Sequence, residues 1–197
     1  MAYIYEIRIW FEVLYALGIL SVIILTFYFT KQRNSIEKQE GLLPAPGIFI
    51  PLGIPFIIIL SHFGEFNAEL FNIRLAGVLL SLYFIIMLPW TLSILGRYTI
   101  PGAGIYKDHI LITSGPFRFI RHPLYSAVIL LWLGAAIGTL NWLLLALWPA
   151  LVLIIYFVPV RQEEKLLTEK FGNSYNDYIR QTGKLIPWFY KGKSAIQ

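Results

Sequence analysis

Residues 123–158 read PLYSAVILLWLGAAIGTLNWLLLALWPALVLIIYFV, and this stretch decides the fold. It divides into two apolar runs, 123–138 and 141–158, joined only by Gly138-Thr139-Leu140-Asn141. A connection this short cannot lead the chain far from the first run, so we expect a tight helical hairpin. The second run is long enough to cross a bilayer, and the first is slightly short of that length.

Three further apolar runs precede this stretch, at 10–29, 47–62 and 73–95. The chain of 197 residues is 57% hydrophobic and 14% charged, whereas soluble domains carry roughly 25% charged residues. A soluble fold of this length could not bury so much apolar surface, so lipid must cover part of it. The sequence predicts an all-α integral membrane protein, a single domain 1–197 with about five transmembrane helices, three of them within 10–95.

The basic residues indicate how these spans are oriented. Five spans place the segment after the first span, the loop 97–122 and the tail 161–197 on one side. That side holds all but two of the 16 Lys and Arg residues, the exceptions being Arg8 and Arg74. Because basic loops stay in the cytoplasm, the tail is predicted inside and the N-terminus outside. The formal net charge of +5 follows from this topology, so we expect no nucleic-acid partner.

Composition excludes several kinds of chemistry. The chain has no cysteine, which rules out disulfides, thiolate nucleophiles and cysteine metal sites. Its three histidines, His62, His109 and His122, are too few for a histidine-rich metal centre, and we expect no metal. The first apolar run lacks a basic leader and a small-residue cleavage site, so we expect no cleavable signal peptide.

The loop 97–122 and the tail 161–197 share the cytoplasmic side in this topology. The loop is rich in Gly and Pro and is expected to hold short elements. Residues 123–160 are expected to form the hairpin. The tail is expected to continue its second helix as an amphipathic helix that ends at Gly172. Tyr175, Tyr178 and Ile179 indicate another short helix, and residues 185–190 resemble an interfacial aromatic stretch.

Arg118, Arg121 and His122 lie directly before Pro123, which opens the fourth span. Proline favours the first helical turn, and the exposed N–H groups at a helix start attract a carboxylate or phosphate. The alternative is that these Arg side chains only extend to the membrane surface.

Two other segments have features of a binding site. Residues 107–117 read KDHILITSGPF, an extended apolar segment before a Gly-Pro turn, whose main-chain groups could bind a planar heterocycle. The alternative is a loop that packs on the bundle. Glu163 and Glu164 are adjacent carboxylates at the membrane boundary, where they need solvent or a partner. They could accept hydrogen bonds from ribose hydroxyls or pair with an ammonium group, or they could be a solvated helix start.

Together, the run His109–Tyr125, the following apolar hairpin, Glu163-Glu164 and the downstream Phe171-Gly172 with Tyr175 and Tyr178 resemble isoprenylcysteine carboxyl methyltransferases. The resemblance covers about residues 98–189. It implies S-adenosylmethionine as cofactor, S-adenosylhomocysteine as product, and a prenylated, lipid-tailed substrate whose carboxylate is methylated. The implied cofactor contacts are His109, Ile110, Leu111, Ile112, Phe117, His122, Pro123, Leu124, Tyr125 and Glu163. The implied catalytic residues are Arg161, Glu164 and Arg121, with either Arg holding the acceptor carboxylate.

The chemistry of the acceptor separates the alternatives. A carboxylate is ionised at neutral pH and needs no general base, whereas the ammonium group of a phospholipid must first lose a proton, for which Glu164 or His122 would be the base. The resemblance extends to phospholipid N-methyltransferases and to membrane sterol reductases, which use NADPH. A non-catalytic membrane scaffold is a further alternative.

Overall fold

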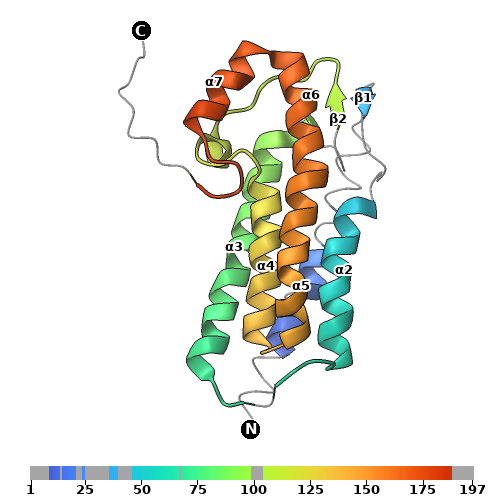
Figure 1. Cartoon of the computed structure of the whole chain (residues 1–197), viewed down its shortest axis with the longest axis vertical. Helices are drawn as coiled ribbons and strands as arrows, with labels where there is room; N and C mark the ends of the chain where they lie inside the picture. Colours follow the sequence, from blue (N-terminus) through green and yellow to red (C-terminus); the bar gives the residue numbers. More distant parts are fainter. Residues whose placement is uncertain are drawn as a thin grey trace.

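The computed structural model describes residues 9–13, 15–20, 24, 36–39, 46–66, 68–98 and 104–187. Residues 9–13 and 15–20 are helical. The elements that follow are β1 (Ile36–Gln39), α2 (Pro46–Ser61), α3 (Phe71–Leu95), η1 (Gly96–Tyr98), β2 (Gly104–Tyr106), η2 (Gly115–Arg118), α4 (Pro123–Gly138), α5 (Trp142–Ile155), η3 (Tyr156–Val160), α6 (Arg161–Phe171) and α7 (Asn173–Gln181). Figure 1 shows a long helical bundle with α6, α7 and the two short strands gathered at one end.

The predicted apolar runs coincide with helices. The runs 47–62, 73–95, 123–138 and 141–158 correspond to α2, α3, α4 and the stretch formed by α5 with η3. For the run 10–29, helix is seen at 9–13, 15–20 and 24, and the remainder lies outside the described residues. The all-α prediction needs one small correction, because β1 and β2 form an antiparallel pair. This pair forms in the polar loop region, where main-chain groups need partners that no helix supplies.

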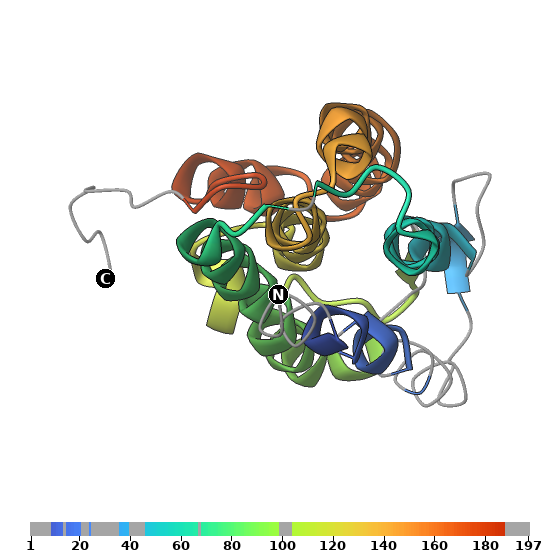
Figure 2. The same cartoon turned by 90° about the horizontal axis from the view of Figure 1, so that it is seen from below.

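Helix α4 lies at the centre of the bundle. Figure 2 shows α3, α5 and the helical residues 9–20 around it, with α2 at the side. Tyr15 donates from its hydroxyl to the main-chain oxygen of Leu131, and Trp148 donates to that of Ile129. The three residues Thr139–Asn141 connect α4 to α5. The two helices lie side by side. Because α4 has 16 residues and each adds 1.5 Å, it is shorter than a hydrocarbon core of about 30 Å, so a membrane-crossing hairpin stays a prediction.

Small residues allow α3 and α4 to approach closely. Gly77 and Ser81 lie four residues apart on α3. They face Gly134 and Gly138, which lie four residues apart on α4. A Cβ added at Gly77 would lie 2.6 Å from the main-chain oxygen of Gly134, and one added at Gly134 would lie 2.7 Å from that of Gly77. Two small residues separated by three others form the usual contact of closely packed membrane helices.

A buried arginine closes the end of the bundle opposite the polar elements. The guanidinium of Arg74 donates to the main-chain oxygens of Gly138, Phe66 and Ala68, at 3.0, 3.3 and 3.3 Å. Its side chain is 3% exposed. Arg74 was one of two basic residues predicted outside the cytoplasmic face, and these contacts show that it ties α3 to the α4–α5 connection.

The helices α5, η3 and α6 form one continuous helical run, Trp142–Phe171. Its middle section, Tyr156–Val160, is a single π-helical turn that contains Pro159. Proline lacks an N–H group and its ring crowds the carbonyl one turn earlier, which a wider turn relieves. Gly172, with φ of +53°, ends the run as predicted, and α7 confirms the second short helix.

Two described helices are long and apolar enough to cross a membrane, Phe71–Leu95 and Trp142–Phe171. Only 33% and 22% of their most apolar windows are buried inside the protein. Leu79, Ile86 and Ile154 are among the large apolar side chains that face outward. A bundle with this much outward-facing apolar surface suits a lipid environment. The number of crossings and their orientation stay predictions.

Candidate functional site

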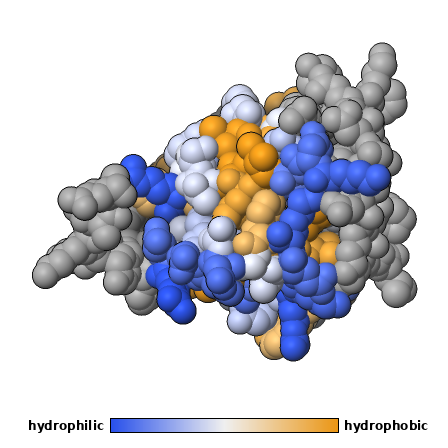
Figure 3. All heavy atoms as spheres, turned by 90° about the horizontal axis from the view of Figure 1, so that it is seen from above, coloured by the Kyte–Doolittle hydropathy of each residue, from blue (hydrophilic) through white to orange (hydrophobic). Residues whose placement is uncertain are grey.

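The polar end of the bundle brings together the start of α4, the start of α6, α7 and residues 182–185. Figure 3 looks onto this end and shows hydrophilic surface on both sides of an apolar strip. The loop 97–122 and the described part of the tail both contribute to it, as their backbone contacts below show.

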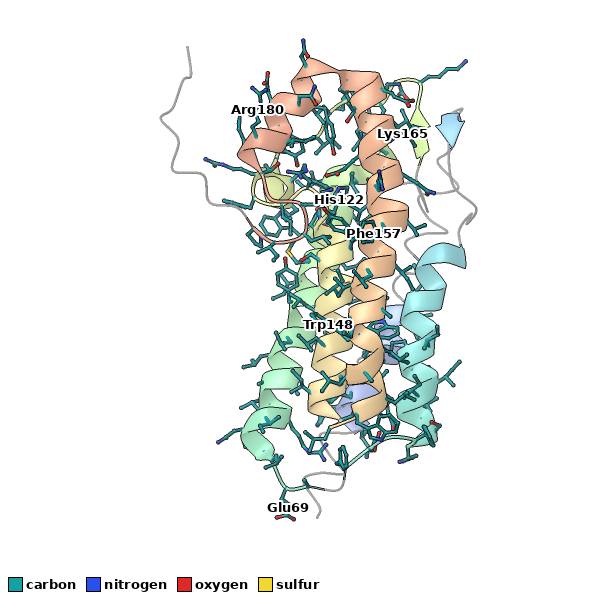
Figure 4. All side chains as sticks on the ribbon, in the orientation of Figure 1. Glu69, His122, Trp148, Phe157, Lys165 and Arg180 are labelled. Atoms are coloured by element: carbon teal, nitrogen blue, oxygen red, sulfur yellow. The ribbon has the colours of Figure 1, made fainter. Side chains whose placement is uncertain are left out.

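His122 lies between the two adjacent carboxylates of α6. Its Nδ1 is 3.5 Å from Oε2 of Glu163, and its Nε2 is 3.5 Å from Oε1 of Glu164. The imidazole is 3% exposed, and Figure 4 shows it at the level where α4 begins. Burial lowers the pKa of His122, but the two carboxylates outweigh that effect and leave this pKa above its usual value. The start of α4 and the start of α6 therefore meet at His122 and Glu163, two of the residues expected to contact the cofactor.

Glu164 is held by two cations. Nζ of Lys184 lies 2.6 Å from Oε2 of Glu164, and Nε of Arg121 donates to Oε1 at 3.1 Å. Burial raises the pKa of Glu164, yet its contacts with His122 and Lys184 lower this pKa to about 2. Glu164 is thus a firmly ionised, fully engaged carboxylate.

Arg121 also holds the tail. Its Nη1 donates to the main-chain oxygens of Ile179, at 3.1 Å, and Thr182. Its main-chain N–H donates to the oxygen of Gly183 at 2.8 Å, and that of His122 donates to Lys184 at 3.1 Å. These hydrogen bonds place residues 182–184 next to Arg121 and His122, which precede α4. The tail is therefore part of the site.

Glu163 is the less constrained of the two carboxylates. Its side chain is 35% exposed, against 15% for Glu164. Because residues two apart on a helix project to opposite sides, Glu163 faces away from Arg161. The ring of Tyr125 lies 5.8 Å from that of His122. Glu163 is therefore the more solvent-accessible of the two carboxylates beside His122.

His109 packs between aromatic rings near this carboxylate. Its ring centre is 4.9 Å from Tyr98 and 6.1 Å from Phe171. Burial and then Lys170 lower the pKa of His109, against smaller opposing effects of Glu163 and Asp108. Its Nδ1 is buried and has no hydrogen-bond partner among the described residues. The main chain of residues 109–113 likewise makes no hydrogen bond with other described main chain.

The other predicted cofactor residues surround these two histidines. Ile110 is 57% exposed and Phe117 is buried. The main-chain oxygen of Phe117 accepts from the hydroxyl of Tyr178 at 2.6 Å. The remaining predicted positions are the half-buried Leu111, Ile112, Leu124 and Tyr125 and the buried Pro123.

The predicted catalytic residues come from the approach to α4 and from the first turn of α6. Arg121 and Glu164 contact each other and the tail, as described above. Arg161 is exposed and lines a groove together with Glu164 and Lys184. The π-turn before Arg161 alters the direction of every later side chain relative to an uninterrupted α-helix, which sequence spacing could not show.

Two polar residues of this end were not singled out as site residues from the sequence. Lys184 had no signal besides its charge. Tyr175 was named in a helix pattern and in the family resemblance but given no role in the site. It is fully buried, and its hydroxyl has no hydrogen-bond partner among the described residues. Burial raises the pKa of Tyr175 far above its usual value, and the carboxylates of Glu164 and Glu163 add to this.

Known proteins are similar to part of this chain. Methanethiol S-methyltransferase 1 of Bradyrhizobium diazoefficiens is 36% identical over 72 residues, which are 36% of this chain and 24% of that protein. Protein-S-isoprenylcysteine O-methyltransferase of Schizosaccharomyces pombe is 30% identical over 81 residues, 41% of this chain and 34% of that protein. The cobalt-zinc-cadmium resistance protein CzcN of Cupriavidus metallidurans is 31% identical over 91 residues, 45% of this chain and 42% of that protein. The matches thus span between a quarter and two-fifths of the length of these relatives.

A family model described as phospholipid methyltransferase matches residues 71–174, from the start of α3 to the start of α7. This range is more than half of the chain and contains His109, His122, Glu163 and Glu164. The chain therefore belongs to the phospholipid methyltransferase family, with isoprenylcysteine methyltransferases among its similar proteins.

Proposed function

We propose that this protein is an S-adenosylmethionine-dependent methyltransferase that methylates the carboxylate of a lipid-tailed, prenylated membrane substrate. The observation that carries the proposal is the 3.5 Å approach of His122 Nδ1 to Glu163, which joins the start of α4 to the start of α6 at the polar end. The family and the isoprenylcysteine methyltransferase relatives support methyl transfer.

The residues at this place fit the groups that such a cofactor carries. Glu163 is half-exposed and can accept hydrogen bonds from ribose hydroxyls or pair with an ammonium group. The main chain of residues 109–112 makes no hydrogen bond with other described main chain, so its donors and acceptors suit a planar heterocycle. Nδ1 of His109 is buried without a partner among the described residues. When bound, the cofactor supplies a methyl group on a positively charged sulfur.

The charges of the site favour a carboxylate over an ammonium acceptor. Glu164, the predicted base for an amine, has a pKa of about 2 and is engaged by Lys184 and Arg121. The two carboxylates beside His122 raise its pKa, which favours its protonated form. A group that already carries a proton cannot accept another, so these surroundings suit an acceptor that needs no base. An ionised carboxylate needs no base, so for it these residues only have to position the reactants and exclude water.

In this proposal all five apolar runs cross the membrane, the N-terminus is outside, and the site is cytoplasmic. The loop 97–122 and the tail 161–197 enclose the cofactor, and 123–160 forms the membrane hairpin within one domain. The excess of basic residues in those two regions supports this orientation. The cofactor would enter from the cytosol, and the lipid-tailed acceptor from the bilayer.

The acceptor is tested with labelled cofactor. Reconstituted protein is incubated with tritiated S-adenosylmethionine and a farnesylated cysteine analogue in phospholipid vesicles. We expect label in a base-labile ester. Base-stable label in extracted phospholipid would instead assign the reaction to amine head groups, a second candidate that the family model favours.

Cofactor binding is tested by calorimetry with S-adenosylhomocysteine. Glu163→Gln should weaken binding by about ten- to a hundredfold, the value of a hydrogen bond to a charged group. Glu169→Gln is the matched control, because Glu169 is an exposed carboxylate of the same helix. No binding by folded wild-type protein would contradict the enzymatic proposal and favour a scaffold.

A further inference from the structure

The second half of α6 contacts the loop that begins at β2. Leu166 is 1% exposed and packs against the buried Ile105 of β2. One helical turn later, Nζ of Lys170 donates to the main-chain oxygen of Lys107 at 2.8 Å. Because Leu166 and Lys170 are four residues apart, they project from the same face of α6, and β2 lies beside this helix in Figure 1. This face of α6 therefore packs against the start of the loop.

The segment that follows Lys107 is held from both of its sides. The main chain of residues 109–113 makes no hydrogen bond with other main chain in the described part of the protein. Such a segment takes its direction from the contacts on either side of it. After it, the hydroxyl of Tyr178 on α7 donates to the main-chain oxygen of Phe117 at 2.6 Å. Before it, Lys170 holds the main-chain oxygen of Lys107.

The charge of Lys170 also acts on His109, the first residue implied to contact the cofactor. The titratable groups that act on this imidazole or pack against it are Tyr98, Asp108, Glu163 and Lys170. Burial and then Lys170 lower the pKa of His109, against smaller opposing effects of Glu163 and Asp108. A neutral imidazole keeps one ring nitrogen as a hydrogen-bond acceptor. Lys170 therefore favours the form of His109 that can both donate and accept.

We propose that Lys170 is a positioning residue for the cofactor, which holds residues 107–112 in the direction that turns Nδ1 of His109 toward the ligand. Lys170 does not itself touch the cofactor. This inference rests on the proposed function, because it takes the segment as the place where S-adenosylmethionine binds. The alternative is that Lys170 only stabilises the last turn of α6, as lysines at helix ends commonly do. Its removal would then leave the segment unchanged.

The position of the segment is tested with a spin label and without cofactor. The chain has no cysteine, so Thr113→Cys gives one labelling site at the exposed end of the segment, and Asp177→Cys gives a reference site on α7. Electron paramagnetic resonance of the full chain in phosphatidylcholine vesicles measures label mobility. Lys170→Met should increase mobility at 113 and leave that at 177 unchanged. Lys165→Met is the matched control, because Lys165 is an exposed lysine of the same helix.

The role in binding is tested by calorimetry with S-adenosylhomocysteine on the full chain without label. Lys170→Met should weaken binding about two- to tenfold, the value of one ordinary hydrogen bond. Lys170→Arg keeps a donor and the charge, so it should retain most of the wild-type affinity.

The pH profile of binding gives a readout that loss of structure alone would not move. Wild-type binding should weaken only below pH 6.5, because the pKa of His109 lies below that ordinary value and protonation removes its acceptor. In Lys170→Met the pKa of His109 rises, so the decline should begin at a higher pH. Lys170→Arg should keep the wild-type profile.

Several results would overturn the proposal. One is a label at 113 that is no more mobile in Lys170→Met than in the wild-type protein, and another is a mobile label with unchanged affinity. An equal loss of affinity in Lys165→Met would assign the effect to surface charge. Absence of binding by folded wild-type protein would contradict the proposed function itself, whereas normal wild-type binding with an unchanged Lys170→Met contradicts only this inference. Melting temperatures check folding, and Lys170→Ala repeats the test with a side chain that favours a helix.

Discussion

Nζ of Lys184 lies 2.6 Å from Oε2 of Glu164, and the main-chain oxygen of the same lysine accepts from the N–H of His122 at 3.1 Å. One tail residue therefore holds both a carboxylate of α6 and the residue that precedes α4. The two adjacent glutamates have different surroundings as a result. Glu164 is held by the tail, and Glu163 is the more exposed of the two.

Replacing Lys184 tests whether the tail organises the site. Lys184→Met should lower stability by about 1.5–3 kcal/mol, because Glu164 loses a charged hydrogen-bond partner. It should also weaken S-adenosylhomocysteine binding, because the tail and His122 are connected. Lys165→Met is the control, because Lys165 is an exposed lysine of α6 whose distance to Glu169 is longer. Its replacement should change stability and binding little. Equal melting temperatures for the two variants would contradict the role of Lys184.

The raised pKa of His122 predicts how stability depends on pH. A pKa raised in the folded state contributes stability that is fully present below about pH 6.5, the unfolded value, and is lost as pH rises through the folded value. Melting temperature in detergent should therefore fall above pH 6.5. His122→Asn should remove that decline, whereas His62→Asn, at an exposed side chain, should retain it. A pH profile unchanged by His122→Asn would exclude this ion pair as the cause.

The lowered pKa of Glu164 predicts how the stability of the fold decreases at acid pH. Its pKa of about 2 in the folded protein is below the ordinary value of 4.5, so its contribution is present above pH 4.5 and is lost as pH falls toward 2. In Glu164→Gln the loss of stability between pH 4.5 and 2 should be smaller than in the wild-type protein. Glu169→Gln, an exposed carboxylate on the same helix, provides the comparison. The measurement is denaturation midpoint against pH in detergent.

The contact between α3 and α4 predicts which glycine tolerates a methyl group. Gly134→Ala would place a Cβ 2.7 Å from the main-chain oxygen of Gly77, so the helices must separate at a cost of about 1–3 kcal/mol or more. A Cβ at Gly53, within α2, would meet nothing within 4 Å, so Gly53→Ala should be neutral or slightly stabilising. Melting temperatures compare them, and a Gly134→Ala protein as stable as wild type would contradict the close approach.

The contacts of Arg74 predict that this residue stabilises the end of the bundle opposite the candidate site. Arg74→Gln removes a charged donor from three main-chain oxygens in a buried place and should cost about 2–3 kcal/mol. Arg118→Gln is the control, since Arg118 is exposed. Cofactor binding by the folded fraction should be unaffected, because Arg74 is in the first turn of α3 and contacts the end of α4, whereas the site is at the start of α4. Thermal denaturation separates the two variants.

The sequence by itself determined where the described helices lie and which of them are apolar. It also predicted that Gly172 ends the helix after the last apolar run. These features depend on local properties: hydrophobic length, glycine in a left-handed conformation, and proline at a helix start. Such properties can be recognised in a short window of sequence.

The tertiary structure decided which of the polar residues act together. Only the path of the tail brings Lys184 to Glu164, and the π-turn sets the direction of Arg161 and of the α6 side chains that follow it. The close contact of Gly77 with Gly134 likewise depends on how α3 crosses α4. The physical reason is that ion pairs and helix contacts depend on distance and direction in space, and one residue added to a single helical turn rotates every side chain after it.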